Sequence, residues 1–292
     1  MTGNGSNEDG NITWAEMTAH VAAELGDRNE ARWVCETAGG FDAGELRAAA
    51  DEWVPERAGK QIESMLRRRL GGEPLQYVLG RWGFRRLDLM VDARVLIPRP
   101  ETELIVDIVV AFVRGAGPGE TVVDLGTGSG AIGLAVLDEL PPGHATVWMT
   151  DASAGALDVA RANAAGTGRA AMGARFAHGS WYAALDGSLR GAVDVIVSNP
   201  PYVAEGDPDL EESVSKWEPS SALLSGRDGL DDLRVIVAGA PEWLRPGGML
   251  ATEMGHAQAD ELIDLYQTAG LRDVRLHRDL AGRDRFVSGL RP

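Results

Sequence analysis

The residues with the clearest chemical potential are Ser198-Asn199-Pro200-Pro201-Tyr202, directly after the apolar run Val193–Val197. The length and β-branched content of that run are typical of a buried strand. Two successive prolines remove two backbone donors, fix two φ angles and hold the preceding residues extended. We therefore expect the Asn199 side-chain carbonyl, the Pro200 backbone carbonyl and the Tyr202 ring in a fixed relation at the carboxyl end of a strand.

Two acceptors beside an aromatic ring suit a planar NH2 group, such as that of an amide or a nucleobase. That nitrogen is a poor nucleophile because its lone pair is delocalised. Accepting both of its hydrogens orients the nitrogen and stabilises the positive charge that grows as it attacks. A rigid strand-ending turn with no ligand is the simpler alternative, and the rest of the chain argues against it.

A second group of candidates surrounds a glycine-rich turn after the predicted strand 121–125. The turn is Gly126-Thr127-Gly128-Ser129-Gly130, and Asp124 stands just before it. Glycines let the backbone approach a ligand closely at a helix N-terminus. Asp151 ends the next predicted strand, where a carboxylate can bind a ribose diol. Ligands of open α/β sheets lie outside the carboxyl ends of the strands, so we expect this turn and Asn199 to border one crevice.

Two cofactor classes compete for the glycine-rich turn. Gly128–Gly133 matches the pattern GxGxxG, and with Asp151 it predicts a nicotinamide-dependent dehydrogenase. Asp124 ahead of the glycines is instead typical of S-adenosylmethionine methyltransferases, whose cofactor has an amino acid end to anchor. A methyl donor would also give the amino-group site at Asn199 a reaction.

After Pro118-Gly119 the pattern alternates between strands and helices, which predicts a mostly parallel, doubly wound, Rossmann-like α/β sheet of seven strands. The last two strands should pair antiparallel across the turn 281–284. Strands are predicted at 121–125, 146–150, 174–177, 193–197, 248–253, 273–278 and 285–290, and helices at 130–140, 154–165, 231–244 and 257–269.

Ahead of this domain we expect a disordered tail (1–11), a small helical bundle (12–74) and a β-hairpin linker (75–97), with the α/β domain at 98–292. The bundle starts at the capping box Thr13-x-x-Glu16. Arg67–Arg69 is most simply a solvated helix face, and a partner-docking surface is the alternative. Predicted helices are 14–25, 28–37, 42–53, 55–70 and 101–114; predicted linker strands are 76–79, 83–87 and 91–97; the predicted bundle core is Trp14, Val21, Leu25, Trp33, Leu46, Trp53, Ile62 and Leu66.

Composition narrows the function further. One cysteine, Cys35, permits no disulfide within the chain, and five scattered histidines without CxxC or HExxH predict no metal site. The polar, acidic N-terminus does not read as a signal peptide, and no apolar stretch predicts a membrane span, so we expect a cytoplasmic protein. A net charge of −16 disfavours nucleic acid as a partner and favours a basic one.

With both candidate sites in view, the chain resembles the PrmC/HemK family of protein-(glutamine) methyltransferases. The resemblance runs from the helical region onward, and the IPRPETE stretch combined with NPPY is its most specific part. The matching stretches are Glu73–Tyr77 with Gly80 and Phe84, Val95–Glu103, Asp124–Gly130, Ser198–Tyr202, Glu218-Pro219, Gly229-Leu230, Pro246–Gly248, and Glu253 with Gly255.

The resemblance implies direct, in-line methyl transfer from S-adenosylmethionine to the glutamine amide in the Gly-Gly-Gln loop of class 1 peptide chain release factors. S-adenosylhomocysteine is the second product, and no metal or covalent enzyme intermediate is needed. It implies a helical domain that helps dock the release factor. Carried over by position, Gly126, Thr127, Gly128, Ser129, Gly130, Asp124, Asp151, Trp181, Asn199, Arg99 and Thr102 contact the cofactor, and Asn199, Pro200, Pro201 and Tyr202 hold the glutamine amide.

One position departs from the family pattern. Ser180 stands where the family often has an acidic residue, just before the tryptophan matched by Trp181. Two other functions stay open at this point: an adenine amino-group methyltransferase, because NPPY is shared with such enzymes, and a non-catalytic protein that binds release factors. Arg67–Arg69 with Arg81, Arg85 and Arg86 could supply the basic patch that the first of these requires.

Overall fold

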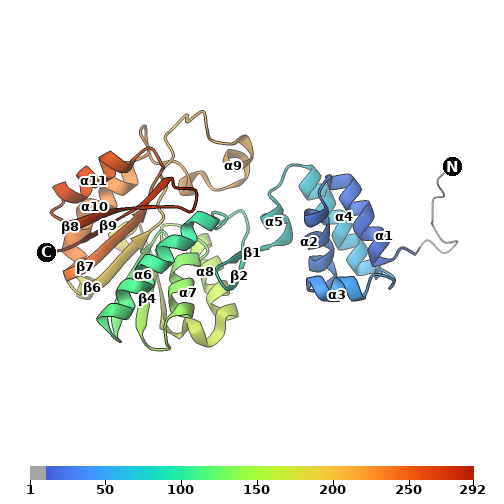
Figure 1. The fold of residues 1–292 in the computed structure, drawn as a ribbon, viewed down its shortest axis with the longest axis horizontal. Helices are drawn as coiled ribbons and strands as arrows, with labels where there is room; N and C mark the ends of the chain where they lie inside the picture. The colour runs from blue at the N-terminus through green and yellow to red at the C-terminus, as the bar shows by residue number, and fades with distance from the viewer. Residues whose placement is uncertain (1–10) are drawn as a thin grey trace. The chain divides into compact units, whose positions relative to one another are not determined.

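The computed structural model describes residues 11–292, so the predicted tail lies outside the described residues except for Asn11. The chain divides into two compact units, the first ending at Gly80 and the second beginning at Arg81 (Figure 1). The division falls ahead of the hairpin, which is therefore part of the second unit.

The first unit is a helical bundle whose helix starts follow the predicted caps. Thr13 and Glu16 form the capping box, and Asp27 and Asp42 accept hydrogen bonds from the first turns of the next two helices. Its core contains most of the expected apolar residues, including Trp14, Val21 and Ile62. The helices are α1 (Trp14–Leu25), α2 (Arg28–Gly39), α3 (Ala43–Ala48), α4 (Glu56–Leu70) and α5 (Leu75–Leu79).

Two predictions for this unit were wrong. The third helix ends at Ala48 and does not reach Trp53, because the segment after it pairs with the start of α1: the Trp14 amide donates to the Glu52 carbonyl and the Val54 amide donates to Ile12. Trp53 is accordingly 50% exposed and lies outside the core.

The run 76–79 is helix α5 rather than a strand. Pro74 precedes the helix as its N-cap, its carbonyl accepts from the Tyr77 and Val78 amides, and Leu75, Tyr77 and Val78 are buried. A short apolar run does not by itself distinguish a buried strand from a buried helical turn.

Arg67 and Arg68 are exposed, in line with the predicted solvated helix face, and Arg69 is half-buried. Two of the three side chains also make contacts within the bundle. Arg68 pairs with Glu73 and also donates to the carbonyls of Tyr77 and Val78. Arg69 donates two hydrogen bonds to Glu30 across the bundle. These guanidinium groups tie α4 to its neighbours and are not free for a partner.

The hairpin consists of β1 (Arg81–Phe84) and β2 (Leu87–Met90), which pair antiparallel. The third strand expected at 91–97 does not form. Within that stretch the Ile97 amide donates to the buried Glu218 carboxylate, so this amide bonds a side chain and not a neighbouring strand.

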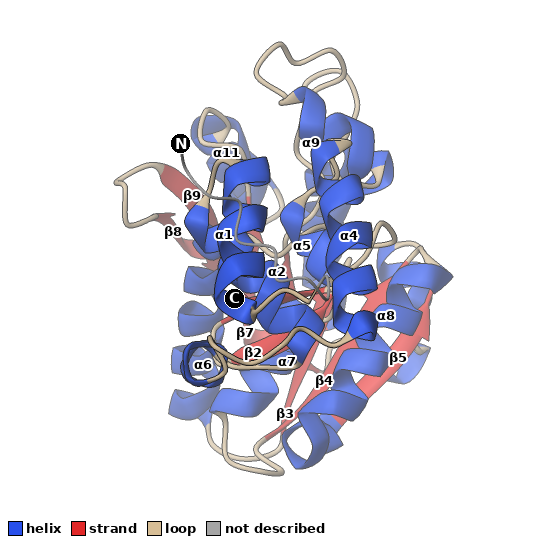
Figure 2. Ribbon diagram, turned by 90° about the vertical axis from the view of Figure 1, so that its right-hand side faces the viewer, coloured by secondary structure: helices blue, strands red, loops and turns tan. Residues whose placement is uncertain are grey.

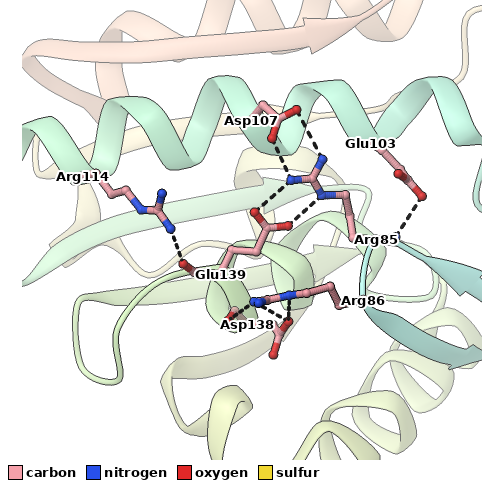
Figure 3. Close-up of polar contacts among 7 residues, drawn as sticks. All are labelled: Arg85, Arg86, Glu103, Asp107, Arg114, Asp138 and Glu139. Carbon is pink, nitrogen blue, oxygen red and sulfur yellow. Dashed lines mark hydrogen bonds and ion pairs between the residues drawn. The ribbon is translucent and has the colours of Figure 1, made fainter.

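Arginine–carboxylate contacts fasten the hairpin turn to the second unit (Figure 3). Arg85 donates to both Asp107 and Glu139, while its backbone amide donates to Glu103. Arg86 donates to the side chain and the backbone carbonyl of Asp138. These contacts hold the hairpin turn against the helices that carry Asp107 and Glu139.

The second unit confirms the predicted α/β class. Its seven-stranded sheet has the order β5-β4-β3-β6-β7-β9-β8; β3 to β7 run parallel, and β9 pairs antiparallel with both β7 and β8. Figure 2 shows helices flanking the strands. The strands are β3 (Glu120–Leu125), β4 (Ala145–Asp151), β5 (Ala174–His178), β6 (Val193–Ser198), β7 (Leu244–Glu253), β8 (Arg272–Arg278) and β9 (Asp284–Leu290).

Two apolar cores cover the two faces of the sheet. On β6, Val195 and Val197 face α6 and α7, whereas Ile196 between them faces α10 and α11. This alternation follows from the two-residue period of a strand buried on both faces. The helices are α6 (Glu103–Ala116), α7 (Ala131–Glu139), α8 (Ala154–Thr167), α9 (Glu212–Trp217), α10 (Asp231–Trp243) and α11 (Ala259–Thr268), with 3-10 turns η1 (Pro100–Thr102), η2 (Gly168–Gly173), η3 (Trp181–Ala184), η4 (Gly187–Leu189) and η5 (Ser220–Ala222).

The strand order reverses between β3 and β6. From β3 the chain proceeds to β4 on one side, and β6 returns to the other side of β3 before leading to β7. The carboxyl ends of β3 and β6 therefore form the switch point at which open α/β sheets bind ligands.

Candidate functional site

A cavity of about 380 Å³ lies at this switch point. The ends of three strands border it: the glycine turn after β3, Asp151 at the end of β4 and Asn199 after β6. The expectation that the glycine turn and Asn199 share one crevice is met. Of the predicted site residues, Arg99, Thr102, Gly126, Thr127, Gly128, Ser129, Asp151, Trp181, Asn199 and Pro201 line the cavity, and Asp124, Gly130, Pro200 and Tyr202 do not.

The glycine turn depends on backbone conformations that favour glycine. Gly126, Gly128 and Gly130 have φ values of 70°, 55° and 84°. Asp124 shapes the turn from below, accepting hydrogen bonds from the Thr127 hydroxyl at 2.6 Å and the Gly133 amide at 3.0 Å. The backbone of the turn is left to face the cavity.

Asp124 is fully buried, and burial raises the pKa of its carboxyl group to about 6. Its Oδ1 atom has no hydrogen-bond partner among residues 11–292. A buried acceptor without a partner costs free energy, and a donor arriving at the turn would relieve that cost.

Asp151 borders the cavity from β4. Its carboxylate accepts from the Gly128 amide at 2.9 Å and from the Ser153 amide at 2.8 Å, so it joins the glycine turn to the start of α8. Desolvation raises the pKa of this carboxyl group. Each carboxylate oxygen can accept more than one hydrogen bond, so a diol could still bind here.

Trp181 lies across the glycine turn with a positive φ of 46°, which is uncommon for a large residue. Its ring packs so closely on Gly126 that an added Cβ there would meet the ring at 3.2 Å. The indole N–H donates to Asp232, which also lines the cavity. Sequence reasoning missed Asp232, which supplies a carboxylate beside Trp181 although Ser180 is not acidic.

Asn199 is held by the loop that precedes α6. Its Nδ2 atom donates to the Thr102 hydroxyl at 3.2 Å, which leaves the side-chain oxygen to accept. One residue earlier, the Ser198 hydroxyl donates to the Leu125 carbonyl at 2.7 Å and joins the ends of β6 and β3.

Tyr202 lies on the far side of the two prolines and lines a separate cavity of about 620 Å³. Its hydroxyl donates to Glu253 at 3.3 Å, and its carbonyl accepts from the Gln258 side chain at 3.0 Å. Burial raises the pKa of the Tyr202 hydroxyl, so it stays protonated at neutral pH. The Gln258 contact was not foreseen from the sequence.

Two buried glutamates support these loops. Glu218 binds both the Ile97 amide and the Arg99 guanidinium, which fixes the IPRPETE loop. Glu253 accepts from Thr102 at 2.7 Å as well as from Tyr202. Both glutamates stand in stretches that carry the family resemblance, yet the sequence alone suggested no role for either.

No group of three histidine, cysteine, aspartate or glutamate side chains within residues 11–292 could hold a metal ion. Over the same residues, no helix has both the length and the apolar character required to cross a membrane.

Comparison with known proteins agrees with this geometry. The PrmC N-terminal domain family matches residues 13–80, and the methyltransferase small domain family matches residues 103–215. The release factor glutamine methyltransferase of Xylella fastidiosa (strain 9a5c) is 44% identical over 88% of this chain and 89% of its own length. The chain belongs to the release factor glutamine methyltransferase family. A Burkholderia pseudomallei member is 42% identical over 91% of this chain and 93% of its own length.

A solved structure supports the fold. A methyltransferase from Pyrococcus furiosus aligns with a TM-score of 0.52 and 17% identity, covering 80% of this chain and 98% of that chain. Membership in a methyltransferase family decides between the two cofactor classes. The GxGxxG pattern at Gly128–Gly133 therefore does not indicate a dehydrogenase.

Proposed function

We propose that this protein transfers a methyl group from S-adenosyl-L-methionine to the side-chain amide nitrogen of glutamine in the Gly-Gly-Gln loop of class 1 peptide chain release factors. Relatives named release factor glutamine methyltransferase align over nearly the whole chain. The observation that carries the proposal is the acceptor oxygen of Asn199 at the edge of a cavity that a cofactor-binding glycine turn also borders.

The residues around the cavity fit this cofactor. The cavity has a volume within the usual range of small-molecule sites, about 300–1,000 Å³. The glycine backbone, with the buried Asp124 carboxylate beneath it, suits the amino acid end of the cofactor, while Asp151 suits a ribose diol and Trp181 an adenine. When bound, S-adenosylmethionine supplies a methyl group on a positively charged sulfur, already activated for transfer.

The chain's contribution to the reaction is placement and electrostatics. The Asn199 side-chain oxygen and the Pro200 carbonyl accept the two amide hydrogens of the substrate glutamine, and Pro201 and Tyr202 bound its plane. These acceptors stabilise positive charge growing on the nitrogen. Orientation of the reacting groups can itself supply up to about 7–11 kcal/mol in favourable cases.

We assign docking of the release factor to the helical unit, with 12–74 as its extent, 75–97 as linker and 98–292 as the catalytic domain. The net charge of −16 favours a basic partner surface. Because release factors act in translation, we place the reaction in the cytoplasm.

Adenine methylation in nucleic acid is the second candidate, since NPPY also suits an adenine amino group. The structure weakens it, because arginines that could have formed a basic patch are neutralised. Arg85 and Arg86 bind carboxylates of α6 and α7, and Arg81 pairs with Asp88. Figure 3 shows the first two of these side chains turned toward their acidic partners.

The test is a transfer assay with labelled S-adenosylmethionine and purified release factor. A Gln→Ala substitution in the Gly-Gly-Gln loop and duplex DNA serve as control acceptors. We expect label only on the intact factor, and an Asn199→Ala enzyme should lose about 100-fold or more in turnover. Label on DNA would favour the second candidate. A melting temperature raised by the cofactor without any transfer would indicate a binding protein.

A further inference from the structure

The inference concerns Glu253, the last residue of β7, and it rests on the role proposed for Asn199. Glu253 is 1% exposed. One carboxylate oxygen accepts from the Thr102 hydroxyl at 2.7 Å, and the other accepts from the Tyr202 hydroxyl at 3.3 Å. Thr102 in turn accepts from Asn199. A single buried carboxylate therefore connects to both ends of the Asn-Pro-Pro-Tyr motif.

The direction of these hydrogen bonds follows from the chemistry of the groups. An ionised carboxylate can only accept, so the single hydroxyl proton of Thr102 points toward Glu253. The Thr102 oxygen then has only lone pairs to offer Asn199, and the Asn199 NH2 group must turn toward it. The Asn199 carbonyl oxygen is left to face the acceptor substrate.

We infer that Glu253 is a positioning residue for methyl transfer, which acts through Thr102 to hold the Asn199 amide with its oxygen toward the substrate glutamine. Protonation of Glu253 reverses the chain of hydrogen bonds. The Glu253 hydroxyl then donates to Thr102, and the Thr102 hydroxyl donates to the Asn199 side-chain oxygen. The Asn199 amide must flip for this, so that its oxygen and its NH2 group exchange places. Its NH2 group would then face the NH2 group of the substrate, where neither can accept.

The surroundings of Glu253 determine when this reversal occurs. Thr102 and the charged Glu101 face it from η1, Tyr202 from the loop after β6, and Arg285 from β9. Burial and Glu101 raise the pKa of Glu253, whereas the hydrogen bonds and Arg285 lower it; the balance places it at about 7. The positioning state is thus the ionised state, present above that pH.

The experiment combines a transfer assay with a direct view of the Asn199 amide. Thr102→Val removes the hydroxyl at nearly constant size, and Thr102→Ser restores it. The matched control is Thr252→Val, which removes the neighbouring buried hydroxyl of β7, whose partner at 2.9 Å is the Tyr266 hydroxyl of α11. Turnover, cofactor affinity and the pH dependence of turnover are measured for each protein.

We expect Thr102→Val to lower kcat by about 10- to 100-fold, because a misoriented acceptor oxygen places the substrate amide wrongly. Thr102 also lines the cavity, so cofactor affinity is measured separately and kcat is compared at saturating cofactor. Thr102→Ser should recover most of the activity, and Thr252→Val should match the parent. The parent's kcat should rise as the pH passes about 7, the pKa of Glu253. In Thr102→Val this rise should vanish, since Glu253 no longer reaches Asn199. Normal kcat in Thr102→Val, or an unchanged pH profile, would overturn the inference.

A nuclear magnetic resonance titration separates this inference from the proposed function. The side-chain amide signals of Asn199 are identified by comparison with Asn199→Asp and followed with pH in the absence of substrate. We expect them to shift near the pKa of Glu253 in the parent and to stay constant in Thr102→Val. A parent that labels no release factor would refute the function alone, and parent signals that do not titrate would refute the inference alone.

Discussion

Gly229 offers the sharpest test of how the structure positions the acceptor motif. It is buried with a φ of +74°, and a Cβ added there would overlap the backbone carbonyl oxygen of Tyr202. The same Cβ would lie 2.7 Å from the Gln258 side-chain nitrogen, which is the donor to that carbonyl. Gly229→Ala must therefore displace Tyr202 and disturb its hydrogen bond together.

Gly206→Ala is the matched control. Gly206 has a φ of +79°, but nothing lies within 4 Å of an added Cβ. Both variants incur the cost of a left-handed alanine, about 1–2 kcal/mol. Only Gly229→Ala must also move the Tyr202 carbonyl, and a displacement of about 1 Å can reduce turnover about 100-fold.

The assay compares kcat, cofactor affinity and melting temperature for the two variants. We expect Gly206→Ala to lower the melting temperature by about 2–8 °C. Gly229→Ala should lower it further, because it also displaces a buried carbonyl, and only Gly229→Ala should lose turnover. Cofactor affinity should persist in both, since neither residue borders the cavity at the switch point. Equal turnover in the two variants would refute the claim that Gly229 fixes the position of Tyr202.

Three further outcomes are expected. Asp151→Asn should weaken binding of S-adenosylhomocysteine by about tenfold or more, because a charged acceptor is lost; calorimetry that finds unchanged affinity would remove its ribose role. Arg85→Met should lower unfolding stability by about 1–3 kcal/mol, because Asp107 and the largely buried Glu139 lose their partner, and an unchanged urea midpoint would contradict this. Burial raises the pKa of Glu253 from 4.5 to about 7, so the folded state holds its proton more tightly and stability falls as pH rises between those values. Glu253→Gln should therefore gain melting temperature relative to the parent over that range, and a constant difference would count against the raised pKa.

The effects of Glu253 on stability and on activity have opposite pH dependence. The ionised carboxylate is the costly form in a buried site, yet it is the form that orients Asn199 under our inference. Such a conflict is common where a site is organised for function rather than for stability.

The sequence by itself determined the sheet domain closely. The predicted strand 193–197 is β6 at 193–198, and the predicted helix 231–244 is α10 at 231–243. Long apolar runs bounded by glycine, proline and polar residues carry a strong local signal. Two successive prolines have few allowed conformations, and the three turn glycines reach positive φ values that other residues rarely adopt, so the two candidate sites could be recognised without coordinates.

Tertiary contacts determined the conformation of the short segments. Residues 76–79 form a helix and residues 91–97 form no strand, because a four- to seven-residue apolar run fits several buried conformations and its packing partners select one. Trp53 is exposed for a similar reason, since its segment pairs with the start of α1.

The side chains that hold the site residues in place likewise could not be predicted from the sequence. Glu253 lies 151 residues from Thr102, and Asp232 lies 51 residues from Trp181. No local pattern specifies such pairs, because they arise when the sheet brings the ends of its strands to one edge. The motif residues can be recognised from the sequence because their residue types constrain the local backbone. The side chains that orient them cannot, because their contacts exist only in the folded chain.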